Sequence, residues 1–137
     1  MPNDLNQALD ASASGMDAQT ARLRIIAQNI ANQDTTGSSL GADAYRRKTI
    51  TFESVLDKAT GVEKVQVKSV GTDPSELPLK YDPTNPAANA QGYVKLPNVN
   101  SFVEMMDMRE AERSYSANLS VMQATRGMLN RTLDILK

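Results

Sequence analysis

The stretch that decides the fold is the C-terminal one, residues 101–137, which reads SFVEMMDMREAERSYSANLSVMQATRGMLNRTLDILK. Large apolar side chains recur in it every seven residues, at Met108, Tyr115, Met122, Leu129 and Leu136. A second series with the same spacing holds Met105, Leu119 and Leu133, and it is interrupted by Glu112 and Arg126. A seven-residue apolar period predicts a long helix that packs along another helix. Ser101 and Glu104 have the spacing of a capping box, so we expect the helix to begin there.

The N-terminal stretch repeats this design. Its apolar series, spaced by seven, is Leu9, Met16, Leu23 and Ile30, and a half-polar companion series is Leu5, Ser12, Gln19 and Ile26. These series predict a helix from about Asp4 to Ile30, with Asn3 as its N-cap after Pro2. Because both ends of the chain carry the same period, the two helices are predicted to pair as a coiled-coil-like α-hairpin.

Between the two helices the sequence changes character, because five of its six prolines lie between Pro74 and Pro97. Residues 33–43 have the composition of a loop. Residues 45–52, 62–70 and 77–81 alternate as strands do. Turn-forming residues separate the last two runs, so 62–70 and 77–81 are predicted to form a hairpin, and 93–96 is predicted as a short strand.

The chain is therefore predicted to be mainly α. Residues 1–32 and 98–137 are expected to form a terminal helical domain, and residues 33–97 a small middle segment of β-hairpin and irregular structure. A pair of such helices buries little apolar surface by itself, so we expect its stripes to find further partners and to complete their folding on assembly.

The composition excludes most chemistry. The 137 residues include no His and no Cys, which removes imidazole and thiolate metal sites, Cys nucleophiles and His-dependent triads. The formal net charge of −1 argues against a nucleic-acid partner. An enzyme using Glu104 and Asp107 as a carboxylate pair stays an alternative, although the sequence supplies no pocket around them. We expect no enzyme, cofactor or metal, no membrane-spanning segment and no cleaved signal peptide.

Several short motifs resemble those of a known family. Residues 14–19 (SGMDAQ) and 27–32 (AQNIAN) are similar to the N-terminal signature shared by the axial proteins of the bacterial flagellum. Further motifs resemble one rod protein of the proximal rod in particular, and they lie at residues 45–48 (YRRK), 81–83 (YDP), 92–94 (GYV), 96–100 (LPNVN) and 113–118 (RSYSAN). The sequence departs from the family at Ala44, where a proline often precedes the tyrosine.

The resemblance implies a structural subunit of the flagellar basal-body proximal rod. It implies terminal helices that form a tube with copies of the chain and with other rod proteins, as a torque-transmitting drive shaft around a protein-export channel. It also implies export by the flagellar type III apparatus, a place in the rod crossing the periplasm, and basal-body rings as further candidate partners. Another rod protein of the same family and a soluble helical adaptor or regulator stay open as alternatives.

On these grounds we expect the assembly interface to consist of residues from the seven-residue series of both helices and of two asparagines near the end of the first helix. The set is Leu9, Met16, Leu23, Ile26, Asn29, Ile30, Asn32, Met105, Met108, Tyr115, Leu119, Met122, Leu129, Leu133 and Leu136. An ordinary helical hairpin whose stripes only face each other has the same period, and the asparagines are equally consistent with capping. Arg46, Arg47 and Lys48 are candidates for ion pairs between subunits, or else belong to a solvated strand.

Overall fold

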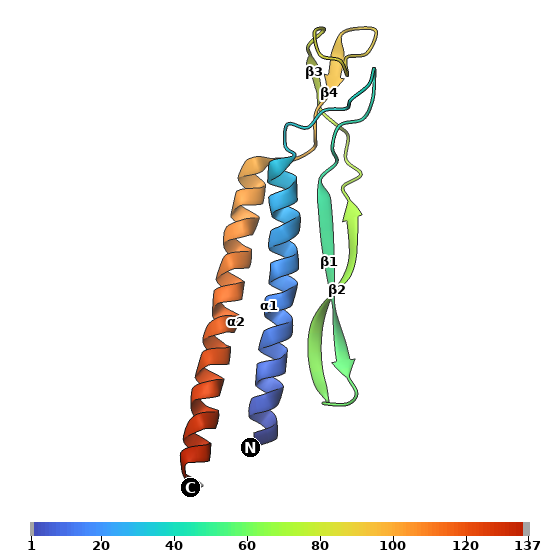
Figure 1. Ribbon diagram of the computed structural model, residues 1–137. Helices are drawn as coiled ribbons and strands as arrows, with labels where there is room; N and C mark the ends of the chain where they lie inside the picture. The colour runs from blue at the N-terminus through green and yellow to red at the C-terminus, as the bar shows by residue number, and fades with distance from the viewer. Residues whose placement is uncertain (1, 136–137) are drawn as a thin grey trace. The chain divides into compact units, whose positions relative to one another are not determined.

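Along the chain, one long helix precedes the β structure and a second long helix follows it (Figure 1). The computed structural model describes the backbone of residues 2–135 and the side chains of residues 4–135. The elements are α1 (Pro2–Ala31), β1 (Lys48–Asp57), β2 (Val62–Thr72), β3 (Leu79–Tyr81), β4 (Tyr93–Lys95) and α2 (Ser101–Ile135). The predicted fold class, mainly α with a small β middle segment, is confirmed.

The predicted N-caps of both helices need correction. Helix α1 already begins at Pro2, so Asn3 lies in its first turn and is not the N-cap. Proline suits the first helical position because an N–H at that position would have no acceptor within the helix. Helix α2 does begin at Ser101, but its cap is Asn100, whose Oδ1 accepts from the main-chain N–H of Phe102 at 3.0 Å. The Glu104 carboxylate does not complete a capping box, since Arg47 and Asn29 bind it instead.

The strands pair differently from the prediction. β1 and β2 form one two-stranded sheet, and β3 and β4 form a second, antiparallel one in which Lys80 lies opposite Val94. The predicted hairpin between residues 62–70 and 77–81 is therefore wrong. The physical reason is a tight turn before β2, where the Gly61 N–H donates to the Asp57 carbonyl at 2.7 Å and Gly61 adopts a φ of 70°.

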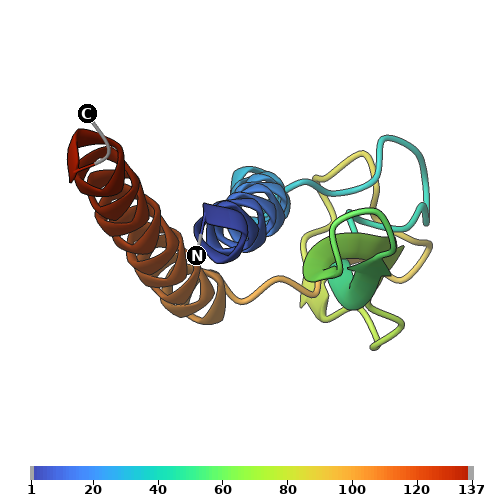
Figure 2. The same ribbon diagram turned by 90° about the horizontal axis from the view of Figure 1, so that it is seen from below.

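The chain forms two compact units. The first comprises residues up to Leu23, residues 51–69 and residues from Arg109 onward; the second comprises Arg24–Ile50 and Val70–Met108. In the first unit, α1 lies between α2 and the β1–β2 sheet (Figure 2). In the second unit, Ala87, Ala88 and Val94 form a small buried apolar cluster. The division into terminal helices and a middle segment stays a prediction.

The buried residues of the helices are mostly small or polar. In the first unit they are Ser12, Ala18, Ala111 and Thr125. Gly15 sits so close to Asn118 that an added Cβ would lie 2.7 Å from its Nδ2. Small side chains thus let α1 and α2 approach closely there, while many large apolar side chains of α2 stay at the surface.

Candidate functional site

A buried carboxylate organises the second unit. Glu104, in the first turn of α2, is 0% exposed. Its Oε1 accepts from Arg47 Nε, and its Oε2 accepts from Asn29 Nδ2 at 3.2 Å. Arg47 also reaches Asp107 through Nη2 at 3.4 Å. A buried charge needs such partners, because an unpaired one in a low-dielectric interior is costly.

Asn29, near the end of α1, binds the start of β1 as a neighbouring strand would. Its Oδ1 accepts from the Lys48 N–H at 2.8 Å, and its Nδ2 donates to the Lys48 carbonyl at 2.9 Å. The Tyr45 hydroxyl donates to the same Oδ1 at 2.8 Å. Burial, followed by the charge of Glu104, raises the pKa of Tyr45, so this hydroxyl stays protonated as a donor. The Asn29 amide is therefore fully used inside the chain.

Asn98 ties two further segments to Arg47. Its Oδ1 accepts from the main-chain N–H of Arg47 at 2.7 Å, and its Nδ2 donates to Ser75 Oγ at 2.8 Å. The Asp73 N–H donates to the Arg47 carbonyl at 2.8 Å. One short segment, residues 45–48, is thereby bonded to the end of α1, to residues 73–75 and to the residues before α2.

The three predicted ion-pairing residues all have partners within the chain. Arg47 pairs with Glu104, and Lys48 Nζ donates to Gln28 Oε1 at 3.1 Å. Arg46 Nη2 lies 3.8 Å from Asp43 Oδ2. Pairing of these three residues with a neighbouring subunit stays a prediction.

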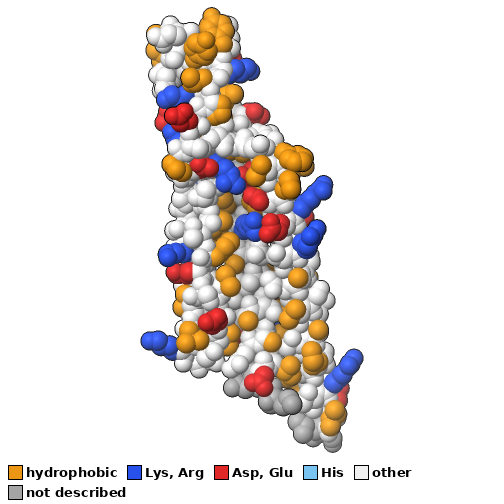
Figure 3. All heavy atoms as spheres, turned by 180° about the vertical axis from the view of Figure 1, so that it is seen from behind, with side chains coloured by type: hydrophobic (Ala, Val, Ile, Leu, Met, Phe, Trp, Pro, Cys, Tyr) orange, Lys and Arg blue, Asp and Glu red, His pale blue; other side chains and the backbone are white. Residues whose placement is uncertain are grey.

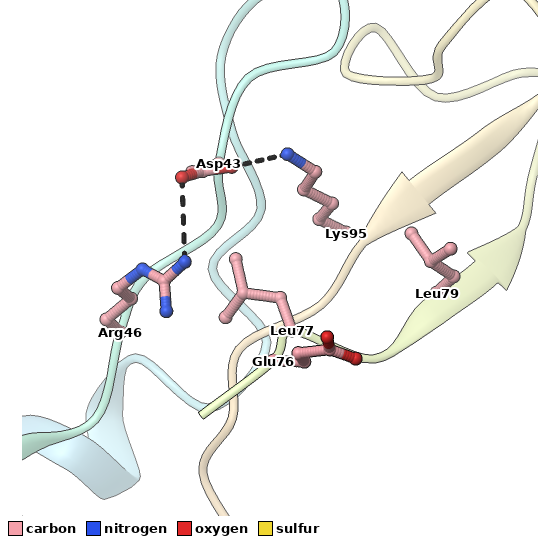
Figure 4. A pocket seen from close by; sticks show the side chains of 6 residues that line it. All are labelled: Asp43, Arg46, Glu76, Leu77, Leu79 and Lys95. Atoms are coloured by element: carbon pink, nitrogen blue, oxygen red, sulfur yellow. Dashed lines mark hydrogen bonds and ion pairs between the residues drawn. The ribbon is translucent and has the colours of Figure 1, made fainter. Parts of the chain in front are cut away.

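A small open pocket of about 250 Å³ lies beside Arg46 (Figure 4). Its wall carries Leu77, Leu79 and Glu76, and Lys95 Nζ donates to Asp43 Oδ1 at 2.6 Å across it. That hydrogen bond and the charge of Lys95 lower the pKa of Asp43. The lowered pKa keeps the Asp43 carboxylate ionised and paired with Lys95.

In the first unit, polar contacts hold the β1–β2 sheet against α1. Lys64 Nζ donates to Asp57 Oδ2 at 2.8 Å and lies 3.8 Å from Asp10 Oδ2. Ser14 Oγ accepts from the Val65 N–H at 3.3 Å. The hydrogen bond from Lys64 is the main cause that lowers the pKa of Asp57 to about 2. These contacts lie at the surface, so salt and low pH weaken them.

The predicted interface residues fall into three groups by exposure. Asn29 and Ile26 are buried in the chain. The residues that are half-buried are Leu9, Met16, Leu23, Ile30, Asn32, Met108, Tyr115, Met122 and Leu129. The companion series of α2 is exposed, with Met105 at 52%, Leu119 at 38% and Leu133 at 52%. Leu136 lies outside the described residues.

The sequence interpretation missed further exposed apolar residues of α2. They are Phe102, Val103 and Met106 in the second unit and Val121, Met128 and Ile135 in the first. Val121, Met128 and Ile135 are also spaced by seven, and this third series was the signal available in the sequence. Figure 3 shows one face of the molecule, where hydrophobic side chains reach the surface in several separate groups.

Two features bear on other classes of site. Among the residues that the structure describes, no group of three or more acidic side chains is placed to hold a metal ion. Over the same range, neither helix combines the length and hydropathy that crossing a bilayer requires.

Comparisons with known proteins decide the family. Residues 9–37 match the model described as "Flagella basal body rod protein", and residues 90–135 match "Flagellar basal body rod FlgEFG protein C-terminal". The flagellar basal-body rod protein FlgC of Agrobacterium fabrum is 53% identical over 133 residues, which cover 97% of this chain and 96% of the relative. The chain belongs to the FlgC family of flagellar basal-body rod proteins.

Other FlgC proteins are similar over nearly the whole chain. That of Bacillus subtilis is 37% identical, with 95% of this chain and 97% of the relative covered. That of Salmonella typhimurium is 38% identical, with 92% and 93% covered. As a FlgC-family member, the chain is a structural subunit of the flagellar basal-body rod and not an enzyme. The resemblance drawn from the motifs is thus confirmed.

Proposed function

We propose that the chain polymerises through α1 and α2 into the tube of the proximal rod, with copies of itself and with other rod proteins. The observation that carries the proposal is the exposure of large apolar side chains along α2, among them Leu119, Val121, Met128 and Leu133. In a single copy these side chains are exposed to water. A helix of a neighbouring subunit would bury them, and this burial of apolar surface stabilises the assembly.

The half-buried series suits the same arrangement. Met108, Tyr115, Met122 and Leu129 are neither sealed inside one copy nor fully exposed, so a second helix can complete their burial. Methionine side chains are flexible and adapt to neighbours of different sequence, as contacts with several kinds of rod subunit require. Asn29 takes a role inside the subunit, since its amide is fully bonded there.

The proposed mechanics follow from the many helix contacts. When helices lock side by side, twist is borne by a continuous layer of packed side chains, so the rod acts as a drive shaft for torque. Residues 44–97 brace neighbouring subunits, and the lumen of the tube serves as the channel for exported proteins. Marginal stability of the free subunit suits passage through the type III apparatus, followed by folding on assembly in the part of the rod that crosses the periplasm.

A matched pair of variants tests polymerisation. Leu133→Asp places a charge at a proposed contact, whereas Asn130→Asp adds the same charge at an exposed polar position of the same helix. We expect Leu133→Asp to abolish motility in cells lacking their own copy and to prevent concentration-dependent light scattering by the purified chain. Asn130→Asp is expected to leave both intact. Equal behaviour of the two variants overturns the proposal.

A further inference from the structure

The apolar period leaves the axial register of the two helices open. Leu9, Met16 and Leu23 repeat every seven residues on α1, and Met108, Tyr115, Met122 and Leu129 do so on α2. If one helix slides along the other by seven residues, about 10 Å at 1.5 Å per residue, each apolar residue of a series takes the place of another member of the same series. The apolar pattern therefore cannot select one register, and another feature must do so.

The buried residues of α2 are not members of its apolar series. They are Glu104, Ala111 and Thr125, and they too are spaced by seven and fourteen residues. Only Glu104 in this set carries a charge, and it binds Arg47 Nε and Asn29 Nδ2. After a slide of seven residues, Ala111 occupies that place and offers nothing for these donors to bind. The polar match exists in one register only.

A second contact has the same register. Gly15 precedes Asn29 by fourteen residues on α1, and Asn118 follows Glu104 by fourteen on α2. The Asn118 side chain fills the space that the missing Cβ of Gly15 leaves. After the same slide, Asn118 meets Ala8 or Arg22, whose side chains occupy that space. Each contact lies within one compact unit, and both specify the same pairing of residues.

We propose that Glu104, together with Arg47 and Asn98, is a register key for the helix pair. The key selects the one axial register in which the half-buried series of α2 faces α1, and Leu119 and Leu133 stay exposed. Removing one polar partner in a buried interface is costly, which makes such groups effective at excluding wrong registers. The proposal rests on the proposed function only in its last step, which assigns the exposed residues to contacts between subunits.

Spin-label distance measurement tests the key. The chain has no cysteine, so Asp17→Cys and Arg131→Cys, both exposed and both in the first unit, accept nitroxide labels selectively. Labelled chains are diluted with unlabelled chains, so that the measured distances are those between two labels of the same chain. This holds for free subunits and for assembled ones. The keyless variant carries Glu104→Leu, Arg47→Met and Asn98→Ala, which leave no unpaired charge at Glu104. All chains carry Gly127→Ala to strengthen α2 at a position without neighbours, and Asn118→Ala to remove the second contact that specifies the same register.

We expect one distance for the chain with its key. In the keyless variant we expect an unchanged helical circular-dichroism signal and a second distance, shifted by about 10 Å. Met122→Ala is the matched control: it weakens the apolar contact but keeps the key, so it should give one distance. A single unchanged distance in the keyless variant overturns the proposal, and so does loss of its helical signal, because the key is assigned to choosing the register and not to holding the helices together. Polymerisation through Leu133 is read separately, so either proposal can fail alone.

Discussion

Arg47 donates from Nε to the carboxylate of Glu104, a side chain fully enclosed by its own subunit and fifty-seven residues away in the sequence. The pair joins the segment before β1 to the first turn of α2. Because Asn29 of α1 binds the other oxygen of the same carboxylate, three parts of the chain depend on one acidic group.

Replacing that group should cost much of the stability of the subunit. We expect Glu104→Ala to lower the free energy of unfolding by about 3 kcal/mol, since it leaves the donors of Arg47 and Asn29 without their acceptor. The matched variant is Glu110→Ala, which removes an exposed carboxylate 3.9 Å from Arg22 and should cost less than about 1 kcal/mol. Urea unfolding followed by circular dichroism measures both, and equal losses would contradict the role given to Glu104.

Asn29 should tolerate no charge. Asn29→Asp keeps the shape of the side chain but turns an oxygen toward the Lys48 carbonyl and toward Glu104, where Nδ2 now donates. We expect a loss of at least about 2 kcal/mol in the free energy of unfolding, together with faster amide exchange at residues 45–50. Asn32→Asp, at a half-buried position near the end of the same helix, is the control and should cost clearly less. Comparable losses would sink this account.

The two helix glycines should respond differently to alanine. Gly127 has no atom within 4 Å of an added Cβ, so Gly127→Ala should raise the free energy of unfolding by about 1 kcal/mol. Gly15→Ala should gain less, because its Cβ displaces the Asn118 side chain. In an Asn118→Ala background the full gain at residue 15 should return. A double-mutant cycle in thermal unfolding reads this coupling, and additive effects would exclude the close contact.

Acid should release the β1–β2 turn from its ion pair. The pKa of Asp57 is lowered to about 2 from an ordinary 3.8, chiefly by the hydrogen bond from Lys64. A lowered pKa in the folded state means that the stabilisation is complete above the ordinary value and is lost as the pH falls through about 2. Carboxyl titration by NMR should show this midpoint, and Lys64→Met should move it up toward 3.8. A midpoint near 3.8 in the unaltered chain would refute the pairing.

Local signals in the sequence were sufficient for the two helices and for the family. The seven-residue series and the absence of proline predicted helices over nearly the observed ranges, because helical structure depends on residues three, four and seven positions apart. The motifs predicted a flagellar rod protein correctly. Strand pairing was predicted wrongly, because the turn at Gly61 closes the β1–β2 pair and the prediction placed the hairpin turn at residues 71–74 instead.

The exposed apolar series could be predicted only in part. Met105, Leu119 and Leu133 were expected at an interface and do lie at the surface. Val121, Met128 and Ile135 are exposed as well, but they belong to a third series that the prediction did not include. A periodic pattern gives the spacing of apolar residues around a helix. It does not say which side of that helix a partner already covers.

Sequence by itself determined the length of the helices, the lack of His and Cys chemistry, and the kinship with flagellar rod proteins. Only the tertiary structure decided that Glu104, expected in a capping box, is a buried ion-pair partner. It also decided that most of the buried residues of the two helices are small or polar. The physical reason is distance along the chain. Capping and periodicity are set by neighbours within two turns, whereas the partner of a buried charge is chosen by whichever segment folds against it, here residues 45–48.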